Sequence, residues 1–245
     1  MNFAPAYKNK KRGVVSVVSE KRLLAAILVG LMMFSLIGCQ TKETSKFSNP
    51  TVGQSDFEFG GHTWVVLDVQ DNRALLLTKD IIENVPYNVK YKKVTWAECT
   101  LREYLNGEFF DTTFTDEEKT RILEVNNSNP DSEWFGTEGG EDTLDKVFLL
   151  SNEEVVKYFG DSGDLLNPPG QLNATMNDAD YVLDDEYSEA RLAEYDGAYV
   201  WWWLRSPGHS RSTASAVTHR GKIHMGGYFV QEKFGLRPAI WINLD

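Results

Sequence analysis

Two apolar segments near the C-terminal end of the chain each enclose one arginine. Residues 201–208 read Trp-Trp-Trp-Leu-Arg-Ser-Pro-Gly, and residues 234–241 read Phe-Gly-Leu-Arg-Pro-Ala-Ile-Trp. A charge that is buried without partners costs several kcal/mol, so a fold that buries these segments must supply partners for Arg205 and Arg237. This requirement constrains the fold more than any other feature of the sequence.

The two arginines allow two interpretations. Their guanidinium groups could face a cleft and bind an anionic or sugar ligand through bidentate hydrogen bonds. Alternatively, each could pair with an internal carboxylate or with backbone carbonyls and fix loops to a sheet, and the apolar flanks favour this structural role. With both roles open, the candidate ligand-binding residues are Trp202, Arg205, His209 and Arg237.

The N-terminal region has the layout of an export signal. A basic segment, residues 8–22, precedes the uncharged apolar run 23–37, and Cys39 follows Leu-Ile-Gly. A membrane-spanning helix needs roughly 20 apolar residues, so an uncleaved anchor is the disfavoured alternative. The pattern resembles a bacterial lipoprotein signal, which implies cleavage before Cys39 and a diacylglyceryl lipid on its sulfur.

We therefore expect three parts in the chain. Residues 1–38 form the signal peptide, and the polar segment 39–55 forms a flexible tether. Residues 56–245 form a single α+β domain, which the lipid anchor holds at the bacterial cell membrane, facing outside.

The charge balance restricts the partners of this domain. The whole chain has a net charge of −11, and residues 1–38 hold six Lys and Arg residues and one acid, so a chain cleaved before Cys39 carries −16. Such a surface repels nucleic acids and anionic lipid head groups. We exclude nucleic acid as a partner and expect membrane contact through the lipid anchor. Cys99 is then the only free thiol, and no intramolecular disulfide is possible.

Alternating and β-branched patterns predict antiparallel strands at both ends of the domain. Turn residues at Gly60-Gly61 and Asp71-Asn72 separate the first three strands. We predict strands over residues 57–59, 62–69, 73–78, 147–150, 198–204, 214–218, 223–225, 228–230 and 236–243.

Three capping boxes predict helix starts. In each, a hydroxyl residue precedes a glutamate by three positions and stands before an apolar pattern with helical spacing. The pairs are Thr95 with Glu98, Thr115 with Glu118, and Ser151 with Glu154. We expect the first helix to end near Asn106-Gly107, and we expect a further short helix within residues 188–195.

The segment 160–195 is loop-rich and acidic. A calcium site needs about six converging oxygens, and Asp178, Asp180 and Asp184 are weak candidates for such ligands. Their spacing does not match an EF-hand, so an acidic loop turned to solvent is the favoured alternative. Calcium is therefore only a possible cofactor, and we expect no other.

Three consecutive tryptophans and several histidines lie near the first arginine in the sequence. Side chains alternate along a strand, so Trp201 and Trp203 share one face and Trp202 takes the other. At least one face belongs to the core, and the other could offer an aromatic platform for a sugar or peptide. His219 and His224 flank a turn, and no Cys/His spacing fits a structural zinc site.

Several of these segments resemble a bacterial domain family of unknown function, whose members are often exported or lipid-anchored. The shared pattern is a Trp near the start, Leu-Arg-x-x-Leu-Asn at 101–106, Phe-Leu-Leu-Ser at 148–151, Trp-Leu-Arg-Ser-Pro-Gly at 203–208 and Gly-x-Arg-Pro-Ala at 235–239. More distantly, the chain is similar to the sulfatase-modifying (formylglycine-generating) proteins, which implies a C-type-lectin-like α+β fold. That oxidase activity needs a late cysteine pair, and no cysteine follows Cys99, so we exclude it.

The sequence contains no catalytic motif that we can identify. Ser206 stands before Pro207 in a turn, and no Gly-x-Ser-x-Gly elbow is present. We therefore expect a non-enzymatic, lipid-anchored binding domain for a glycan, a cell-wall fragment or a protein. The alternative is a hydrolase or transferase of envelope polymers that uses carboxylates of the 178–189 loop.

Overall fold

The computed structural model describes residues 50–168 and 181–245. The chain divides into two units, residues 1–48 and residues 49–245. The expected signal peptide, Cys39, Asp178 and Asp180 lie outside the described residues. No helix in the described part has the length and apolar character needed to cross a membrane.

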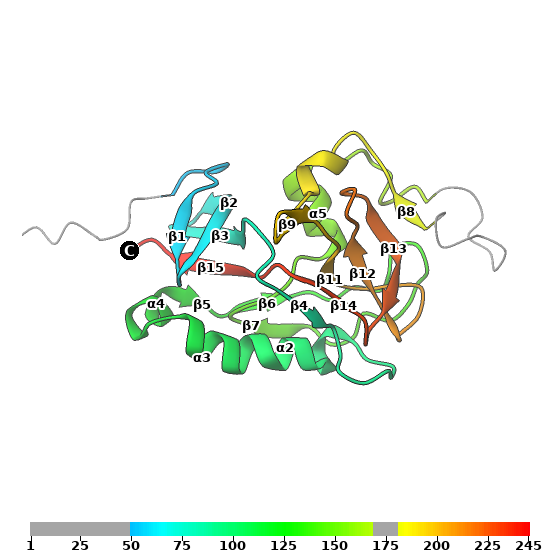
Figure 1. Cartoon of the computed structure of the whole chain (residues 1–245), viewed down its shortest axis with the longest axis horizontal. Helices are drawn as coiled ribbons and strands as arrows, with labels where there is room; N and C mark the ends of the chain where they lie inside the picture. The colour runs from blue at the N-terminus through cyan, green and yellow to red at the C-terminus, as the bar shows by residue number, and fades with distance from the viewer. Residues whose placement is uncertain (1–49, 169–180) are drawn as a thin grey trace, which may run out of the picture. The chain divides into compact units, whose positions relative to one another are not determined.

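The first sheet is antiparallel and joins the two ends of the domain (Figure 1). The turns between its first strands use Gly60 and Gly61, with φ of 56° and 71°, and Asp71 and Asn72, with φ of 49° and 57°. The predicted strands and turns of this region are confirmed. In spatial order the strands are β1 (Phe57–Phe59), β2 (His62–Gln70), β3 (Arg73–Thr78), β15 (Ala239–Asn243) and β5 (Ile122–Leu123).

Residues just before the predicted boundary at Asp56 already pair with β2. The Gly53 N–H donates to the Val66 carbonyl at 2.9 Å, and the Val66 N–H donates to the Gln54 carbonyl at 2.8 Å. The end of the segment predicted as a tether is therefore bound to β2, and residues 39–49 lie outside the described residues.

The second sheet is mixed, with β11 and β14 parallel and its other described pairs antiparallel. In spatial order its strands are β4 (Glu83–Pro86), β14 (Lys233–Leu236), β11 (Trp202–Pro207), β12 (Thr213–Val217), β13 (Ile223–Phe229) and β8 (Val182–Leu183). Two small ribbons pair β6 (Val125–Asn127) with β7 (Thr143–Asp145), and β9 (Glu194–Tyr195) with β10 (Ala198–Tyr199).

The chain passes from the second sheet to the first at Arg237-Pro238. The predicted single strand 236–243 is therefore wrong, because β14 ends at Leu236 and β15 begins at Ala239 (Figure 1). Proline has no N–H to give to a strand partner, whereas its carbonyl accepts the Thr78 N–H at 3.0 Å. One continuous apolar run thus contributes a strand to each of the two sheets.

Four other predicted strands also differ from the structure. Residues 147–150 are fully buried but extend no ladder beyond the bridge from Phe148 to Ala239. The segment 198–204 is interrupted before Trp202, and Gly226-Gly227 lies inside β13 instead of separating two strands. The pairing of β12 with β13 contains a register shift between Ala214 and Ala216, and this irregularity accommodates the glycines.

All three capping boxes are confirmed as start points of helical turns. The first opens only a single 3₁₀ turn, and the Cys99 sulfur then caps the next helix by accepting the Arg102 N–H at 3.4 Å. The helical segments are η2 (Trp96–Glu98), α2 (Thr100–Tyr104), η3 (Leu105–Phe109), α3 (Phe110–Thr113), α4 (Asp116–Arg121), α5 (Asn152–Phe159) and η5 (Ser188–Arg191).

The first long helix does not end at Asn106-Gly107 as predicted. It continues through the π-helical segment η3 into α3, and the three segments form one uninterrupted helical path (Figure 1). The described residues thus form an α+β domain of mostly antiparallel strands with a few short helices.

Candidate functional site

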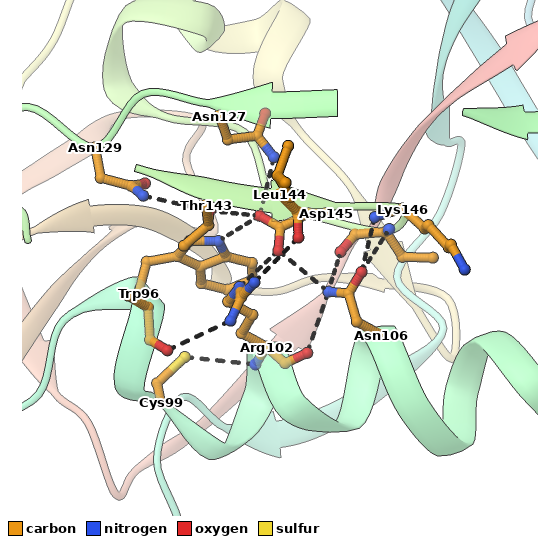
Figure 2. Close-up of polar contacts among 12 residues, drawn as sticks. Trp96, Cys99, Arg102, Asn106, Asn127, Asn129, Thr143, Leu144, Asp145 and Lys146 are labelled. Carbon is orange, nitrogen blue, oxygen red and sulfur yellow. Dashed lines mark hydrogen bonds and ion pairs between the residues drawn. The ribbon is translucent and has the colours of Figure 1, made fainter. Parts of the chain in front are cut away.

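A fully buried carboxylate, Asp145 on β7, organises one polar network (Figure 2). One carboxylate oxygen accepts hydrogen bonds from Trp96 Nε1 at 3.0 Å, Asn127 Nδ2 at 3.0 Å and Thr143 Oγ1 at 2.7 Å. The other accepts from Arg102 Nε at 2.5 Å. Because this carboxylate is enclosed and its oxygens are occupied by donors, its role is structural and not that of an exposed acid or base.

The same network explains the Leu-Arg-x-x-Leu-Asn segment. Asn106 donates from Nδ2 to the Val147 carbonyl at 2.8 Å, and its Oδ1 accepts the N–H groups of Lys146 and Val147. Arg102 also donates to the Leu144 carbonyl at 3.1 Å. Both polar residues of the helix thus bind the chain at β7, which sequence reasoning missed. The available signal was an arginine on an apolar helix, which needs a carboxylate partner.

Arg205 lies in the interior and links β11 to α5. It forms an ion pair with Glu154 and donates to the Leu149 carbonyl at 2.8 Å. Glu154 also accepts the Ser151 N–H at 2.9 Å as part of the capping box. Only 5% of Arg205 is exposed, and its partners are an internal carboxylate and a backbone carbonyl. These contacts favour a structural role for this arginine over direct ligand binding.

Arg237 is held at the crossover between the sheets without a carboxylate in hydrogen-bond contact among the described residues. It donates to the carbonyls of Thr78 at 2.9 Å and Lys79 at 3.1 Å. Its guanidinium carbon lies 4.9 Å from the ring centre of Trp202 and 5.6 Å from that of Phe159. Burial lowers the pKa of Arg237 to about 10, against the opposing effect of the Asp80 charge, so the group remains a cation at neutral pH.

The four candidate ligand-binding residues do not form one surface. Trp202 is fully buried, and Arg205 and Arg237 are only 5% and 3% exposed, although Arg237 also lines an open pocket together with Asp80 and Tyr199. His209 is exposed and lies against Phe135 and Tyr181, with Nδ1 at 2.7 Å from the Gly226 carbonyl. Trp202 and Arg237 contact each other, whereas His209 packs against Phe135 and Tyr181.

Two of the described acids of the loop, Asp184 and Asp185, are paired with cations. Asp184 forms an ion pair with Lys222 at 2.5 Å. Asp185 forms a buried bidentate pair with Arg191 at 2.8 Å for each contact, which sequence reasoning missed. Burial raises the pKa of Asp185, but the Arg191 hydrogen bonds and charge outweigh burial and lower it overall. No cluster of three or more metal-binding side chains occurs among the residues that the structure describes.

An open groove lies beside the second sheet, on the face that carries Trp201. This Trp201 groove has a volume of about 320 Å³. Trp201 is half-buried, and its ring lies 6.0 Å from Tyr228 and 5.1 Å from Phe234. Its described lining residues are Val182, Trp201, Thr218, His219, Arg220, Lys222, His224 and Tyr228.

Strand alternation and a hydrogen bond orient the tryptophan of this groove. Trp203 also packs on Phe234, at 4.6 Å, while Trp202 faces Arg237, as the predicted alternation requires. Trp201 Nε1 donates to His219 Nδ1 at 3.1 Å, so the indole edge is fixed. His219 and His224 both lie in this groove, and no sequence pattern connects them with Trp201.

Arg220 provides most of the positive charge that a ligand in the groove can reach. Lys222 is paired with Asp184, whereas the Arg220 side chain is exposed and has no ion pair among residues 50–168 and 181–245. The groove therefore combines an apolar aromatic wall, two histidines and one exposed guanidinium group, an arrangement suited to ligand binding.

Comparison with known proteins gives a family but no function. No curated protein and no solved structure matches the chain. The profile of a family described as a domain of unknown function, DUF6273, matches residues 71–244, from the turn after β2 to the end of β15. Because this match covers more than half of the sequence, the chain belongs to the DUF6273 family.

Proposed function

We propose that this protein is a lipid-anchored, non-enzymatic binding protein of the bacterial cell surface, and that its Trp201 groove binds a sugar unit carrying an acidic group. The observation that carries the proposal is the half-buried Trp201 ring in an open groove next to the exposed Arg220 guanidinium. Glycans and cell-wall fragments contain such units, and they are the ligand class we assign to the groove.

The chemistry of the groove supports this ligand class. The apolar face of a sugar ring packs on an aromatic side chain, and Trp201 is the largest ring in the groove. A guanidinium group binds a carboxylate through two parallel hydrogen bonds, and Arg220 is placed to supply them. The volume of about 320 Å³ lies at the lower end of the range for small-molecule sites, which suits one sugar unit.

The alternative, a hydrolase or transferase of envelope polymers, has less support. The described loop acid next to the groove, Asp184, is paired with Lys222, and Asp185 is buried against Arg191. A carboxylate pair for acid–base work requires two such groups facing each other across a cleft. Asp178 and Asp180 lie outside the described residues.

The anchor and the finer fold class belong to the same proposal. The basic and apolar segments before Cys39 support lipid attachment at this residue. The Trp-Leu-Arg-Ser and Gly-x-Arg segments, together with the antiparallel strands, support a C-type-lectin-like fold. Metabolic labelling with an alkyne fatty acid tests the anchor: the wild-type protein is expected to incorporate the label in the membrane fraction, and Cys39→Ala is expected to lose it.

Binding is tested with a matched pair of sugars, galacturonic acid and galactose, titrated into the purified full-length protein in detergent. We expect the acidic sugar to bind more tightly than the neutral one. Trp201→Leu should weaken binding of both sugars by about tenfold or more, because it removes the stacking surface. Arg220→Gln should mainly abolish the preference for the acid.

The matched control is Arg211→Gln, which removes a half-buried arginine that pairs with Glu98 and Glu138 and does not line the Trp201 groove. It should leave both affinities unchanged. Thermal unfolding midpoints show whether each variant is folded. If folded Trp201→Leu and Arg220→Gln proteins bind both sugars as the wild type does, the groove is not the binding site.

A further inference from the structure

A row of aromatic side chains continues from the Trp201 groove onto the exposed surface. Tyr228, which lines the groove, lies 6.0 Å from Phe229, and Phe229 lies 5.7 Å from Tyr91. The exposed fractions increase along this row, from 40% for Tyr228 and 44% for Phe229 to 62% for Tyr91. We call the row Tyr228–Phe229–Tyr91 the aromatic track.

The backbone holds the track in place. The last two residues of β13 are both exposed, although its first five are buried. The loop that carries Tyr91 is fixed to the neighbouring chain at both ends, because the Asn88 N–H donates to the Val230 carbonyl and the Val94 N–H donates to the Arg211 carbonyl, each at 2.8 Å. The segments that carry these exposed rings are therefore held by strand pairing and by backbone hydrogen bonds.

The same loop carries a local excess of positive charge. Lys90, Lys92 and Lys93 are exposed and form no ion pair with any residue of the described ranges. The acid in the neighbouring turn is Glu232, whose N–H donates to the Phe229 carbonyl at 3.0 Å. In a chain with a net charge of −11, this cluster is an exception that attracts an anionic partner to the track.

We infer that the Trp201 groove and the aromatic track form one continuous surface for a chain of acidic sugars. The inference rests on the proposed function and extends it from a single sugar unit to a polymer. Successive sugar rings pack on Trp201, Tyr228, Phe229 and Tyr91, while their acidic groups face Arg220 at one end and Lys90, Lys92 and Lys93 at the other. Sequence-tolerant stacking on a series of rings beside a positive surface is also how proteins hold other linear polyanions.

The surface predicts an affinity that depends on ligand length. A ligand that occupies only the groove gains nothing from the track, whereas a longer ligand adds contacts without a second loss of translational freedom. The charge contribution also increases with length, so salt should weaken the binding of long chains more than that of short ones.

The test uses oligogalacturonates of increasing length, titrated into the purified full-length protein in detergent at low and at moderate salt. For the wild type, we expect the longest oligomer to bind at least about tenfold more tightly than the monosaccharide. The double variant Tyr91→Ser with Lys92→Gln should lose most of this ratio and most of the additional salt dependence. Both positions are exposed, so the substitutions leave the core intact.

A matched double variant, Lys79→Gln with Tyr199→Ser, removes the same two chemical groups from other exposed positions and should keep the full ratio. If the monosaccharide binds in a Trp201-dependent manner but the affinity does not increase with length, the polymer inference is wrong and the proposed function stands. A length effect that is equal in both double variants also overturns the inference. Failure of the monosaccharide to bind at all overturns the proposed function itself.

Discussion

At the scale of single residues, the buried polar groups of this protein decide which chemistry it can perform. Four charged residues are buried or partly buried, a combination that often indicates an active site. They are Asp145, Arg102, Arg205 and Arg237. Each of them instead contacts internal partners that satisfy most of its hydrogen-bonding groups. The residues available to a ligand are the less buried Trp201 and Arg220.

Replacing Asp145 tests the structural interpretation of the buried network. Asp145→Asn removes the negative charge that compensates Arg102 and places an N–H₂ group against other donors. We expect a loss of about 3–5 kcal/mol in the free energy of unfolding, measured by urea denaturation. The exposed Asp111→Asn is the control and should change stability by less than about 0.5 kcal/mol. Equal stabilities for the two variants would contradict the role of Asp145.

Cys99 provides a chemical test of burial. Its thiol is 3% exposed, and burial raises its pKa to about 12, so the reactive thiolate is scarce at pH 8. We expect iodoacetamide to leave Cys99 unmodified in the native protein and to modify it fully in denaturant, as measured by peptide mass spectrometry. Rapid modification under native conditions would show that the N-terminus of α2 opens readily.

At the scale of elements, the Asp185–Arg191 pair links the start of η5 to its end and to the end of α5. Arg191 also donates to the Gly160 carbonyl at 3.0 Å, so a single fully buried side chain connects the end of α5 with η5. The pair therefore fixes residues 185–191, which belong to a segment that the sequence describes only as loop-rich and acidic.

The pair predicts a specific dependence of stability on pH. The pKa of Asp185 is lower in the folded state than the unfolded value of about 3.9, so its contribution is complete above that value and is lost as the pH falls through the folded pKa. Urea denaturation between pH 5 and 2 should therefore show a steeper loss for the wild type than for Asp185→Asn, which is already destabilised at neutral pH. Asp184→Asn, at an exposed pair, should follow the wild-type curve.

Alanine substitutions at two glycines test how closely η5 packs against the groove. Gly221 and Gly61 both have left-handed backbones, with φ of 77° and 71°. A Cβ at Gly221 would lie 1.7 Å from the Ser188 carbonyl oxygen, whereas a Cβ at Gly61 meets nothing within 4 Å. Gly61→Ala should cost about 1 kcal/mol in thermal unfolding, and Gly221→Ala about 1–3 kcal/mol more. Equal costs would mean that Ser188 moves away without penalty.

At the scale of the whole molecule, the last strands connect the two sheets. β14 pairs with β11 and β4, and β15 pairs with β3 and β5. The crossover is fixed by Arg237, whose hydrogen bonds reach the end of β3. The second sheet cannot lose β14 without disturbing the centre of the first.

We therefore expect residues 50–245 to unfold in one cooperative step. Far-UV circular dichroism and tryptophan fluorescence should give the same midpoint in urea, because Trp64 and Trp241 belong to the first sheet, and Trp202 and Trp203 to the second. Two separate transitions would show that the crossover does not couple the sheets.

Local features of this protein follow from short stretches of its sequence. The three capping boxes, the turns at Gly60-Gly61 and Asp71-Asn72, and the alternation of the three tryptophans depend on neighbouring residues, and all of them appear as predicted. The need for internal partners at Arg205 and Arg237 was also evident, because a buried charge is costly wherever it lies.

Which distant side chains pair with each other depends on how the chain folds as a whole. The sequence contains many acids and bases and does not rank them as partners. The ion pairs that form are Arg205 with Glu154, Arg102 with Asp145, and Arg191 with Asp185. The division of residues 234–241 between two sheets, and the meeting of Trp201, His219 and Arg220 in one groove, likewise depend on strand order. Local propensity acts over a few residues, whereas these contacts join segments that come together only when the sheets form.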